Sequence, residues 1–253
     1  MSRKTLTCAT ATVALLLSTG LATAATADDG NDLTAQQLSD KAQEGLVKAK
    51  SVHMKLTDKS ADAATSKTQP TSIDLSLDQD GNCAGSMRMG SDGGGVQIVK
   101  RGAEVWMKPD ADFWKAQMPG GQGSAAAELF KNRYIHGSTS DTLLKGVADI
   151  CDLKSFQQAA TGDSGDAKSL KKGAETTVDG TKVIPLTHKE DGTTTTMYVT
   201  TDSDHHLFRA TETGNGAETT LTFTDYDKPV PSATPSADQS VDIGKLRSEL
   251  QMQ

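Results

Sequence analysis

The chain has 253 residues, of which 33 are acidic and 26 basic, so its formal net charge is −7. This acidity argues against nucleic acid as a partner, because clustered positive charge supplies most of the affinity for nucleic acid. It also argues against a strong overall attraction to anionic membranes. Only 4% of the residues are aromatic, so the interior is built mainly from Leu, Ile, Val and Met, or is incompletely filled.

The N-terminus has the layout of a secretory signal peptide. Two basic residues open the chain, an apolar run follows at 13–17, and small residues at 22–27 precede the first acidic residues. The apolar run is shorter than the ~20 residues that span a bilayer. We therefore expect cleavage near Ala27 and a mature protein that is secreted and works in the cell envelope.

The cysteines indicate a disulfide and argue against a lipid anchor. A lipoprotein signal places its cysteine directly behind the apolar run, whereas Cys8 lies before it and residues 21–27 contain none. The later pair, Cys83 and Cys151, is most simply a disulfide in a secreted chain. Neither has a CxxC partner, so a redox or zinc site is not expected.

The first predicted element behind the signal peptide is a helix over 33–50. Apolar residues recur there at spacings of three and four, which gives a one-sided apolar stripe. Thr34 with Gln37 is typical of a capping box at the helix start.

An antiparallel meander follows this helix. Polar and apolar residues alternate strictly over 72–78, and Asp80-Gly81 is a tight hairpin turn. A further turn at 109–112 is expected to lead into one more strand. The predicted strands are 72–78, 83–89, 96–99, 103–108 and 113–116.

The middle of the chain has helical spacing at 125–130 and 141–159, and a second meander follows. Pro185 in its first strand favours an edge or a bulge. One domain is expected over 28–228, between the signal peptide 1–27 and a Pro-rich C-terminal extension 229–253 that forms a linker or surface strap. The strands predicted in the second meander are 182–187, 194–200, 207–212 and 218–223.

This order of elements predicts an α+β fold with one antiparallel sheet, since neither half has enough apolar residues for a core of its own. Antiparallel sheets twist and coil, and the helices have to bury their apolar stripes against one face. We therefore expect a highly curved sheet with helices covering its concave face and an apolar cleft between the two layers.

Four stretches, 51–56, 105–116, 197–210 and 223–230, carry a resemblance to a known family, and the last is the most specific. They resemble elements of the LolA-like group, in particular the LppX/LprA/LprF/LprG lipoproteins of actinobacterial envelopes. The resemblance implies an open antiparallel half-barrel whose helices cover a cavity for acyl chains. It also implies that the protein carries lipids, lipoglycans or lipoproteins. The missing lipobox cysteine sets this chain apart from the lipoproteins, but LolA carriers are themselves soluble.

The apolar residues of the strands and of the 141–159 helix are the candidate ligand site. They either line an acyl cavity or fill an ordinary, densely packed core, and both interpretations stay open. Flexible methionine side chains favour the first, because thioethers adapt to variable apolar ligands. The candidates are Ile73, Leu75, Leu77, Met87, Met89, Val105, Met107, Leu144, Val147, Val199, Leu221 and Phe223.

The sequence contains no pattern typical of catalysis, a metal site or a cofactor. None of its five histidines lies in an HExxH motif, and no GxSxG motif is present. Asp202–His206 is typical of a solvated hairpin turn rather than a metal site, and Asp78–Asn82 lacks the later residues of a calcium loop. We expect a protein that is not an enzyme and has no cofactor.

Two functions fit these observations. The first is a monomeric carrier or binding protein for a lipid or acyl chain, in which each buried methylene contributes about 0.8 kcal/mol. The second is an envelope interaction or sensor module of the same fold that binds a protein partner without lipid transfer. A connected apolar cavity of roughly 300–1,000 Å³ favours the carrier, and a solid interior favours the module.

Overall fold

The computed structural model describes residues 30–118, 120–160 and 170–245. The signal peptide predicted at 1–27 and the end of the C-terminal extension lie outside the described residues. The helices are α1 (Ala35–Lys48), α2 (Ala61–Thr65), α3 (Ala111–Gln117), α4 (Gln122–Leu129), α5 (Thr142–Ile150), α6 (Leu153–Ala160) and the 3-10 helix η2 (Ala237–Gln239).

The strands of the N-terminal half are β1 (Ser51–Asp58), β2 (Pro70–Asp78), β3 (Cys83–Met89), β4 (Gly95–Arg101), β5 (Glu104–Pro109) and β6 (Tyr134–Ser138). Those of the C-terminal half are β7 (Lys171–Lys172), β8 (Thr176–Val178), β9 (Thr181–Glu190), β10 (Thr193–Thr200), β11 (Leu207–Gly214), β12 (Ala217–Thr224) and β13 (Ser240–Asp242).

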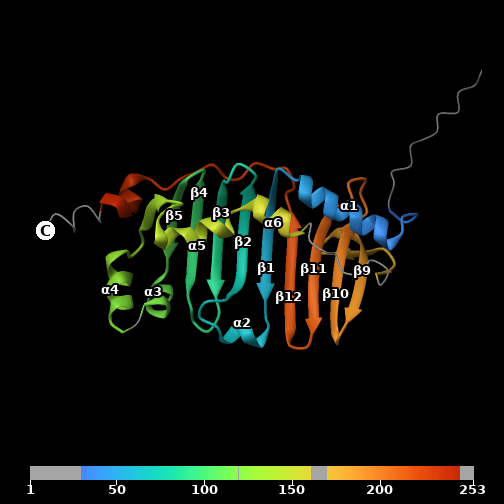
Figure 1. Cartoon of the computed structure of the whole chain (residues 1–253), viewed down its shortest axis with the longest axis horizontal. Coiled ribbons are helices and arrows are strands. Elements are labelled where there is room, and N and C mark those ends of the chain that lie inside the picture. Colours follow the sequence, from blue (N-terminus) through green and yellow to red (C-terminus); the bar gives the residue numbers. More distant parts are fainter. Residues whose placement is uncertain (1–29, 119, 161–169, 246–253) are drawn as a thin grey trace, which may run out of the picture.

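Within the described residues, these strands form one 13-stranded sheet with the order β13-β6-β5-β4-β3-β2-β1-β12-β11-β10-β9-β7, and β8 pairs with β9 beside this path. All pairs are antiparallel except β13 with β6. Because β1 pairs with both β2 and β12, it joins the two meanders into one sheet. Helices α1, α5 and α6 lie across one face of this sheet (Figure 1). The α+β fold predicted from the sequence, an open half-barrel with helices on its concave face, is confirmed.

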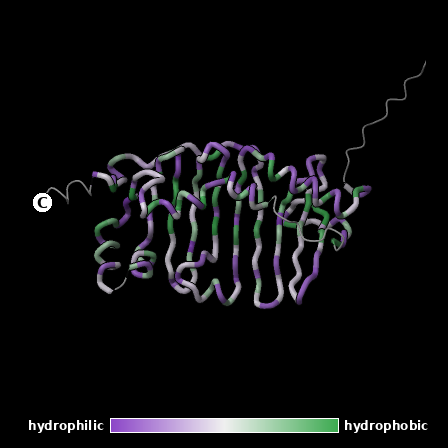
Figure 2. Tube along the Cα trace, in the orientation of Figure 1, coloured by the Kyte–Doolittle hydropathy of each residue, from purple (hydrophilic) through white to green (hydrophobic). Residues whose placement is uncertain are grey.

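The alternation of polar and apolar residues sets the sheet's two faces. Leu75 and Leu77 of β2 are fully or almost fully buried, at 0% and 1% exposed. Figure 2 shows hydrophobic residues concentrated midway along the strands and hydrophilic residues in the loops at their ends. The apolar band therefore runs across the strands, under the helices.

Two local predictions, the capping box of the first helix and the turn at Asp80-Gly81, are confirmed. The Thr34 hydroxyl accepts from the Gln37 backbone N–H, and the Gln37 side chain accepts from Thr34 N at 2.8 Å, which forms the capping box of α1. At the β2–β3 turn, one oxygen of Asp78 accepts from the backbone of Asp80 and Asn82, both at 2.9 Å.

The strand predicted at 113–116 is wrong, because these residues belong to α3. The Asp110 carboxylate accepts from the Phe113 backbone N–H at 2.9 Å and so caps a helix directly behind Pro109. Trp114 then packs its ring against Phe130, directly behind α4, with ring centroids 5.4 Å apart. Local capping and this aromatic contact outweigh the strand preference of Phe and Trp.

The single helix predicted over 141–159 is also wrong, since the chain forms α5 and α6 with a break between them. The Asp152 side chain accepts from Ser155 N at 3.1 Å and starts the second helix. The break holds Cys151, which forms the predicted disulfide with Cys83 of β3, with a Cα–Cα distance of 5.5 Å. The bridge fixes the junction of α5 and α6 to the sheet.

Residues behind β12 run along the ends of the strands before β13 joins the sheet beside β6 (Figure 1). The Arg101 guanidinium donates to the backbone oxygen of Pro231 on this path. At the other end of the sheet, β7 and β8 pair with β9 on either side of Pro185, so this proline lies at a gap in the outer ladder of β9 and not on the outermost strand. Among the described residues, no helix combines the length and apolarity needed to cross a membrane.

Candidate functional site: an open apolar groove

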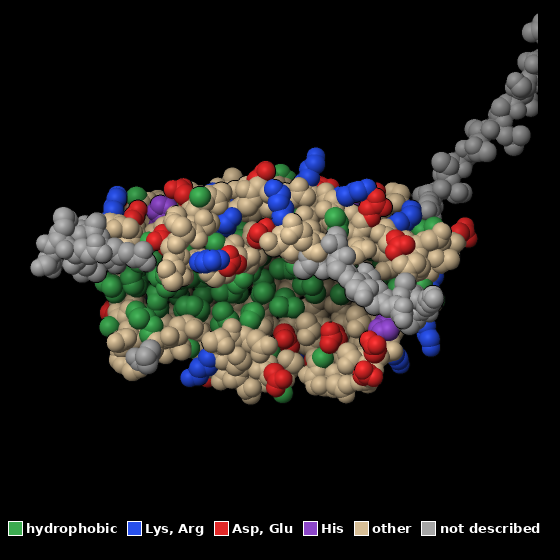
Figure 3. Space-filling view, in the orientation of Figure 1, with side chains coloured by type: hydrophobic (Ala, Val, Ile, Leu, Met, Phe, Trp, Pro, Cys, Tyr) green, Lys and Arg blue, Asp and Glu red, His purple; other side chains and the backbone are tan. Residues whose placement is uncertain are grey.

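An open groove lies on the helix-covered face of the sheet, between the helices and the strands. Figure 3 shows a band of hydrophobic side chains that runs from the left end of the view to its centre, below α5 and α6. Two hollows lie in this band, one of about 540 Å³ and one of about 350 Å³. Ile150 of α5 lines both, so we treat them as one apolar groove with a first and a second hollow.

The first hollow is walled by both layers of the fold. The sheet contributes methionines of β3 and β5, and α3, α4 and α5 contribute aromatic and aliphatic side chains. Among the described residues that line it, the polar side chains are those of Thr68 and Gln117. The apolar lining residues are Met87, Met89, Met107, Phe113, Trp114, Met118, Ala126, Phe130, Leu143, Gly146, Val147, Ile150 and Ile243.

The second hollow lies over the centre of the sheet, where β1 meets β2 and β12. Its floor is Met54, Leu56, Ile73 and Leu221, and Phe156 of α6 forms one wall. Its rim is acidic through Asp149 and Asp152. A hydrogen bond from the Ser155 hydroxyl lowers the pKa of Asp152 and so favours its ionised form, whereas Asp149 is paired with Lys145 at 2.8 Å.

The helices above the groove are fixed along one side. The Gln157 side chain of α6 donates to the backbone oxygens of Leu46 and Ala49 at 2.9 and 2.8 Å, which ties α6 to the end of α1. The disulfide holds the α5–α6 junction. A Cβ placed on Gly146 of α5 has no atom within 4 Å, so the space beside this helix is open.

The structure divides the candidate ligand residues into three groups. One group lines the groove: Ile73, Met87, Met89, Met107, Val147 and Leu221. A second group is buried in the core beneath it: Leu75, Leu77, Val105, Leu144 and Phe223. Val199 lies apart, in a separate cluster with Leu38, Ala42, Ile184 and Leu186 under α1.

Several groove residues were missed by the sequence reasoning, chiefly Phe113, Trp114 and Phe130. The strand predicted at 113–116 gives no reason to place the first two over the sheet. The signal that identifies them is Asp110, three residues before Phe113, because this spacing is typical of a helix cap.

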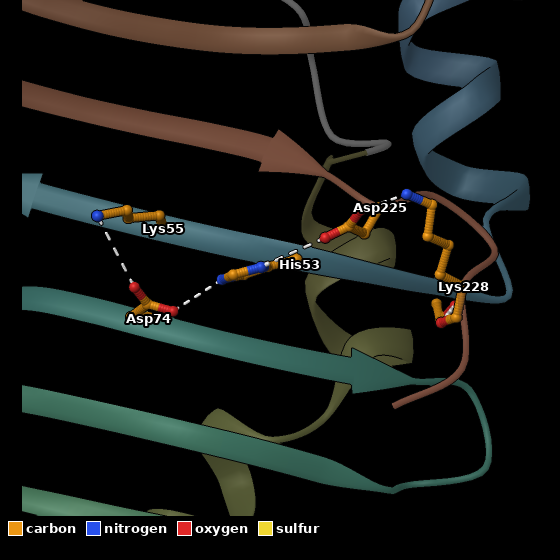
Figure 4. A network of polar contacts seen from close by, with 6 residues as sticks. His53, Lys55, Asp74, Asp225 and Lys228 are labelled. Carbon is orange, nitrogen blue, oxygen red and sulfur yellow. Dashed lines mark hydrogen bonds and ion pairs between the residues drawn. The ribbon is translucent and has the colours of Figure 1, made fainter. Parts of the chain in front are cut away.

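A polar network lies on the opposite face of the sheet, where β1, β2 and the end of β12 meet (Figure 4). His53 Nε2 is 2.7 Å from an Asp74 oxygen, and His53 Nδ1 is 3.7 Å from an Asp225 oxygen. Lys228 donates to Asp225 at 2.6 Å and is the main reason why the pKa of Asp225 is lowered. Because Val52 and Met54 on either side of His53 face the core, this network lies away from the apolar groove.

The solvated turn predicted at Asp202–His206 needs correction. Asp202 does build a turn, since its carboxylate accepts from the backbone of Asp204 and His205 at 3.2 and 3.1 Å. However, His205 is fully buried, and His206 stacks on Tyr226 with ring centroids 4.1 Å apart. Side-chain atoms of Asp202, Asp204 and His206 lie within 4.8 Å of one another, but the first two are exposed acids of an ordinary turn.

No protein-family model and no curated protein sequence matches this chain. Among solved structures, the fold is similar to the crystal structure of LprF from Mycobacterium bovis, with a TM-score of 0.54 and 11% identity over 80% of this chain and 97% of that one. The lipoprotein LppX from Mycobacterium tuberculosis gives a TM-score of 0.48 and 14% identity over 80% of this chain and 100% of that one. At such low identity the likeness concerns the fold, which is the LolA-like fold that the sequence resemblance implied.

Proposed function

We propose that the protein binds an acyl chain of a lipid in the apolar groove and acts as a non-enzymatic carrier or binding protein outside the cytoplasm. The observation that carries this proposal is an open groove lined on both layers by apolar side chains. The volume of its first hollow, about 540 Å³, lies in the range usual for small-molecule sites.

The chemistry of the lining supports an apolar ligand. Burial of each methylene of an acyl chain contributes about 0.8 kcal/mol, so a chain of ordinary length binds without directional polar contacts. Met87, Met89, Met107 and Met118 line the first hollow, and their flexible thioethers adapt to chains of different shape. An apolar band of this extent on a protein surface is unfavourable in water unless something covers it.

The first experiment is organic extraction of the full-length, natively exported protein, followed by mass spectrometry of the extract. We expect a lipid to co-purify with the protein, and the mature chain to begin at Asp28. An extract without lipid, together with no binding of an added fluorescent fatty acid, would contradict the proposal. That outcome would favour the interaction module that binds a protein partner.

A groove-filling variant tests the site itself. Gly146→Phe places a ring in the open space beside α5 and also removes a helix-interior glycine, so the fold should be retained. We expect affinity for the fluorescent fatty acid to fall at least roughly tenfold, the equivalent of about two methylenes. The matched control is Ala125→Phe, on an exposed helix position outside both hollows, which should bind as the wild type does.

A further inference from the structure

A third hollow, of different chemistry, lies on the other side of the α3–α4 end of the molecule. Its volume is about 560 Å³. Arg88 follows Met87 in β3 and Lys108 follows Met107 in β5, so these basic side chains lie on the face of the sheet opposite the apolar groove. Lys131, just behind α4, completes the basic lining of what we call the cationic hollow.

Positive charge dominates this hollow. Asp110 is the one acid among the described residues that line it, and it accepts from the backbone of Gly95 and Phe113 at 2.8 and 2.9 Å as a helix cap. Within the described part of the chain, Arg88 and Lys108 form no ion pair with a carboxylate. The Lys108 ammonium lies 4.9 Å above the Tyr134 ring.

This local charge contrasts with the whole chain, whose net charge is −7. Exposed lysines are commonly just solvated, and alone they are weak evidence for binding. Here, however, Arg88 and Lys108 from two strands line one concavity together with Lys131, which is itself paired with the exposed Glu128 at 3.5 Å. An anionic group that enters the hollow is attracted to Arg88 and Lys108, whose charges no carboxylate of the described residues pairs.

An exposed apolar side chain lies beside these cations. Leu129 at the end of α4 is 63% exposed, and it is two residues from Lys131. A protruding leucine next to basic residues fits a lipid surface, where apolar insertion and attraction to anionic headgroups act together. Trp114 of α3 and Phe130, directly behind α4, line the first hollow of the apolar groove at this same end of the molecule.

We propose that the α3–α4 end is a docking surface for an anionic lipid membrane. A headgroup phosphate enters the cationic hollow, Leu129 enters the interface, and the end of the apolar groove is held beside the membrane. This contact does not depend on the proposed acyl-chain binding, since Arg88, Lys108, Lys131 and Leu129 do not line the apolar groove, although Met87 borders both the cationic hollow and the first hollow of the groove.

Co-sedimentation of the protein with vesicles tests this proposal. We expect binding to vesicles that contain phosphatidylglycerol, weak binding to pure phosphatidylcholine, and loss of binding as the salt concentration rises. Lys108→Gln should weaken binding about fivefold, the usual effect of one basic residue near an anionic surface. Leu129→Ser should weaken it as well.

The matched control is Lys189→Gln, which changes the net charge equally at an exposed position of β9, at the other end of the sheet. Equal loss in both lysine variants, or no binding of the wild type, would overturn the proposal. Competition by inorganic phosphate at equal affinity would also overturn it, in favour of a soluble anion. Gly146→Phe should retain vesicle binding, and its loss in this variant would assign binding to the apolar groove instead.

Discussion

The two halves of the sheet present the same kind of apolar face, yet one is closed and the other open. Over the C-terminal half, α1 is a single helix of 14 residues, and it packs Leu38 tightly against Ile184 and Val199, all 0% exposed. Over the N-terminal half, α5 and α6 have 9 and 8 residues and cover only a strip. Ile73 and Met89 stay half-buried beside them.

This difference shows that the helices, rather than the strands, decide where the groove lies. A continuous helix with a narrow apolar face lies flat on the sheet and excludes solvent. Two short helices, joined at a disulfide-linked break, keep their position without covering the whole apolar band. The groove is therefore the part of the apolar face that no helix covers.

We expect the largest loss of stability when the disulfide that holds α5 and α6 over the N-terminal half of the sheet is removed. The bridge Cys83–Cys151 closes a loop with a sequence separation of 68 residues. Replacing both residues by Ala should lower the free energy of unfolding by about 4 kcal/mol, measured by urea denaturation. Affinity for fatty acid should fall as well, because α5 and α6 lose their anchor. An unchanged unfolding midpoint would mean that packing alone holds these helices.

A pair of substitutions compares the closed and open halves directly. Leu38→Ala under α1 should cost about 3 kcal/mol of stability, because it leaves a cavity in a closed cluster. Met89→Ala in the groove should cost about 1 kcal/mol or less, because Met89 is only partly buried. The affinity for fatty acid should fall more in the Met89→Ala variant than in the Leu38→Ala variant. Equal destabilisation by both variants would contradict the distinction between closed core and open groove.

We expect the smallest loss of stability from a substitution at Asp225, where the two halves of the sheet join. Lys228 holds the pKa of this carboxyl below its ordinary value, so the ionised form stabilises the folded state. This stabilisation is present above the unfolded-state pKa of about 4 and is lost as the pH falls through the lower folded-state pKa. Because the pair is largely exposed, Asp225→Asn should cost only ~0.5 kcal/mol at pH 7. Urea midpoints of the two proteins should converge as the pH falls through the folded-state pKa of Asp225, and a constant gap would refute this assignment.

Local patterns predicted much of the fold. Strict alternation placed Leu75 and Leu77 on the inner face, Thr34 marked the start of α1, and the compartment indicated the disulfide. The helix at Phe113–Ala116 was missed because its cap at Asp110 competes with a strand preference that is strong in short aromatic segments.

The groove could be predicted only in part, because the pattern within a strand says nothing about the helices packed on it. Alternation tells which residues face the concave side, but not which helix covers them. Val199 and Met89 therefore looked equivalent, although α1 closes over Val199 and Met89 borders the open groove. That distinction depends on helix length and on the break at Cys151, which are properties of the other layer.

The central claim, that an acyl chain enters the groove, can be tested with the chain's own fluorescence. Trp114 lines the first hollow, whereas Trp106, the other tryptophan, stacks on His136 outside the groove, with ring centroids 4.5 Å apart. In the Trp106→Phe variant, titration with an unlabelled fatty acid should change the Trp114 emission saturably. Adding Gly146→Phe should shift this response to at least roughly tenfold higher fatty-acid concentration. A Trp114 emission that does not change, or that changes equally in both variants, would contradict the account.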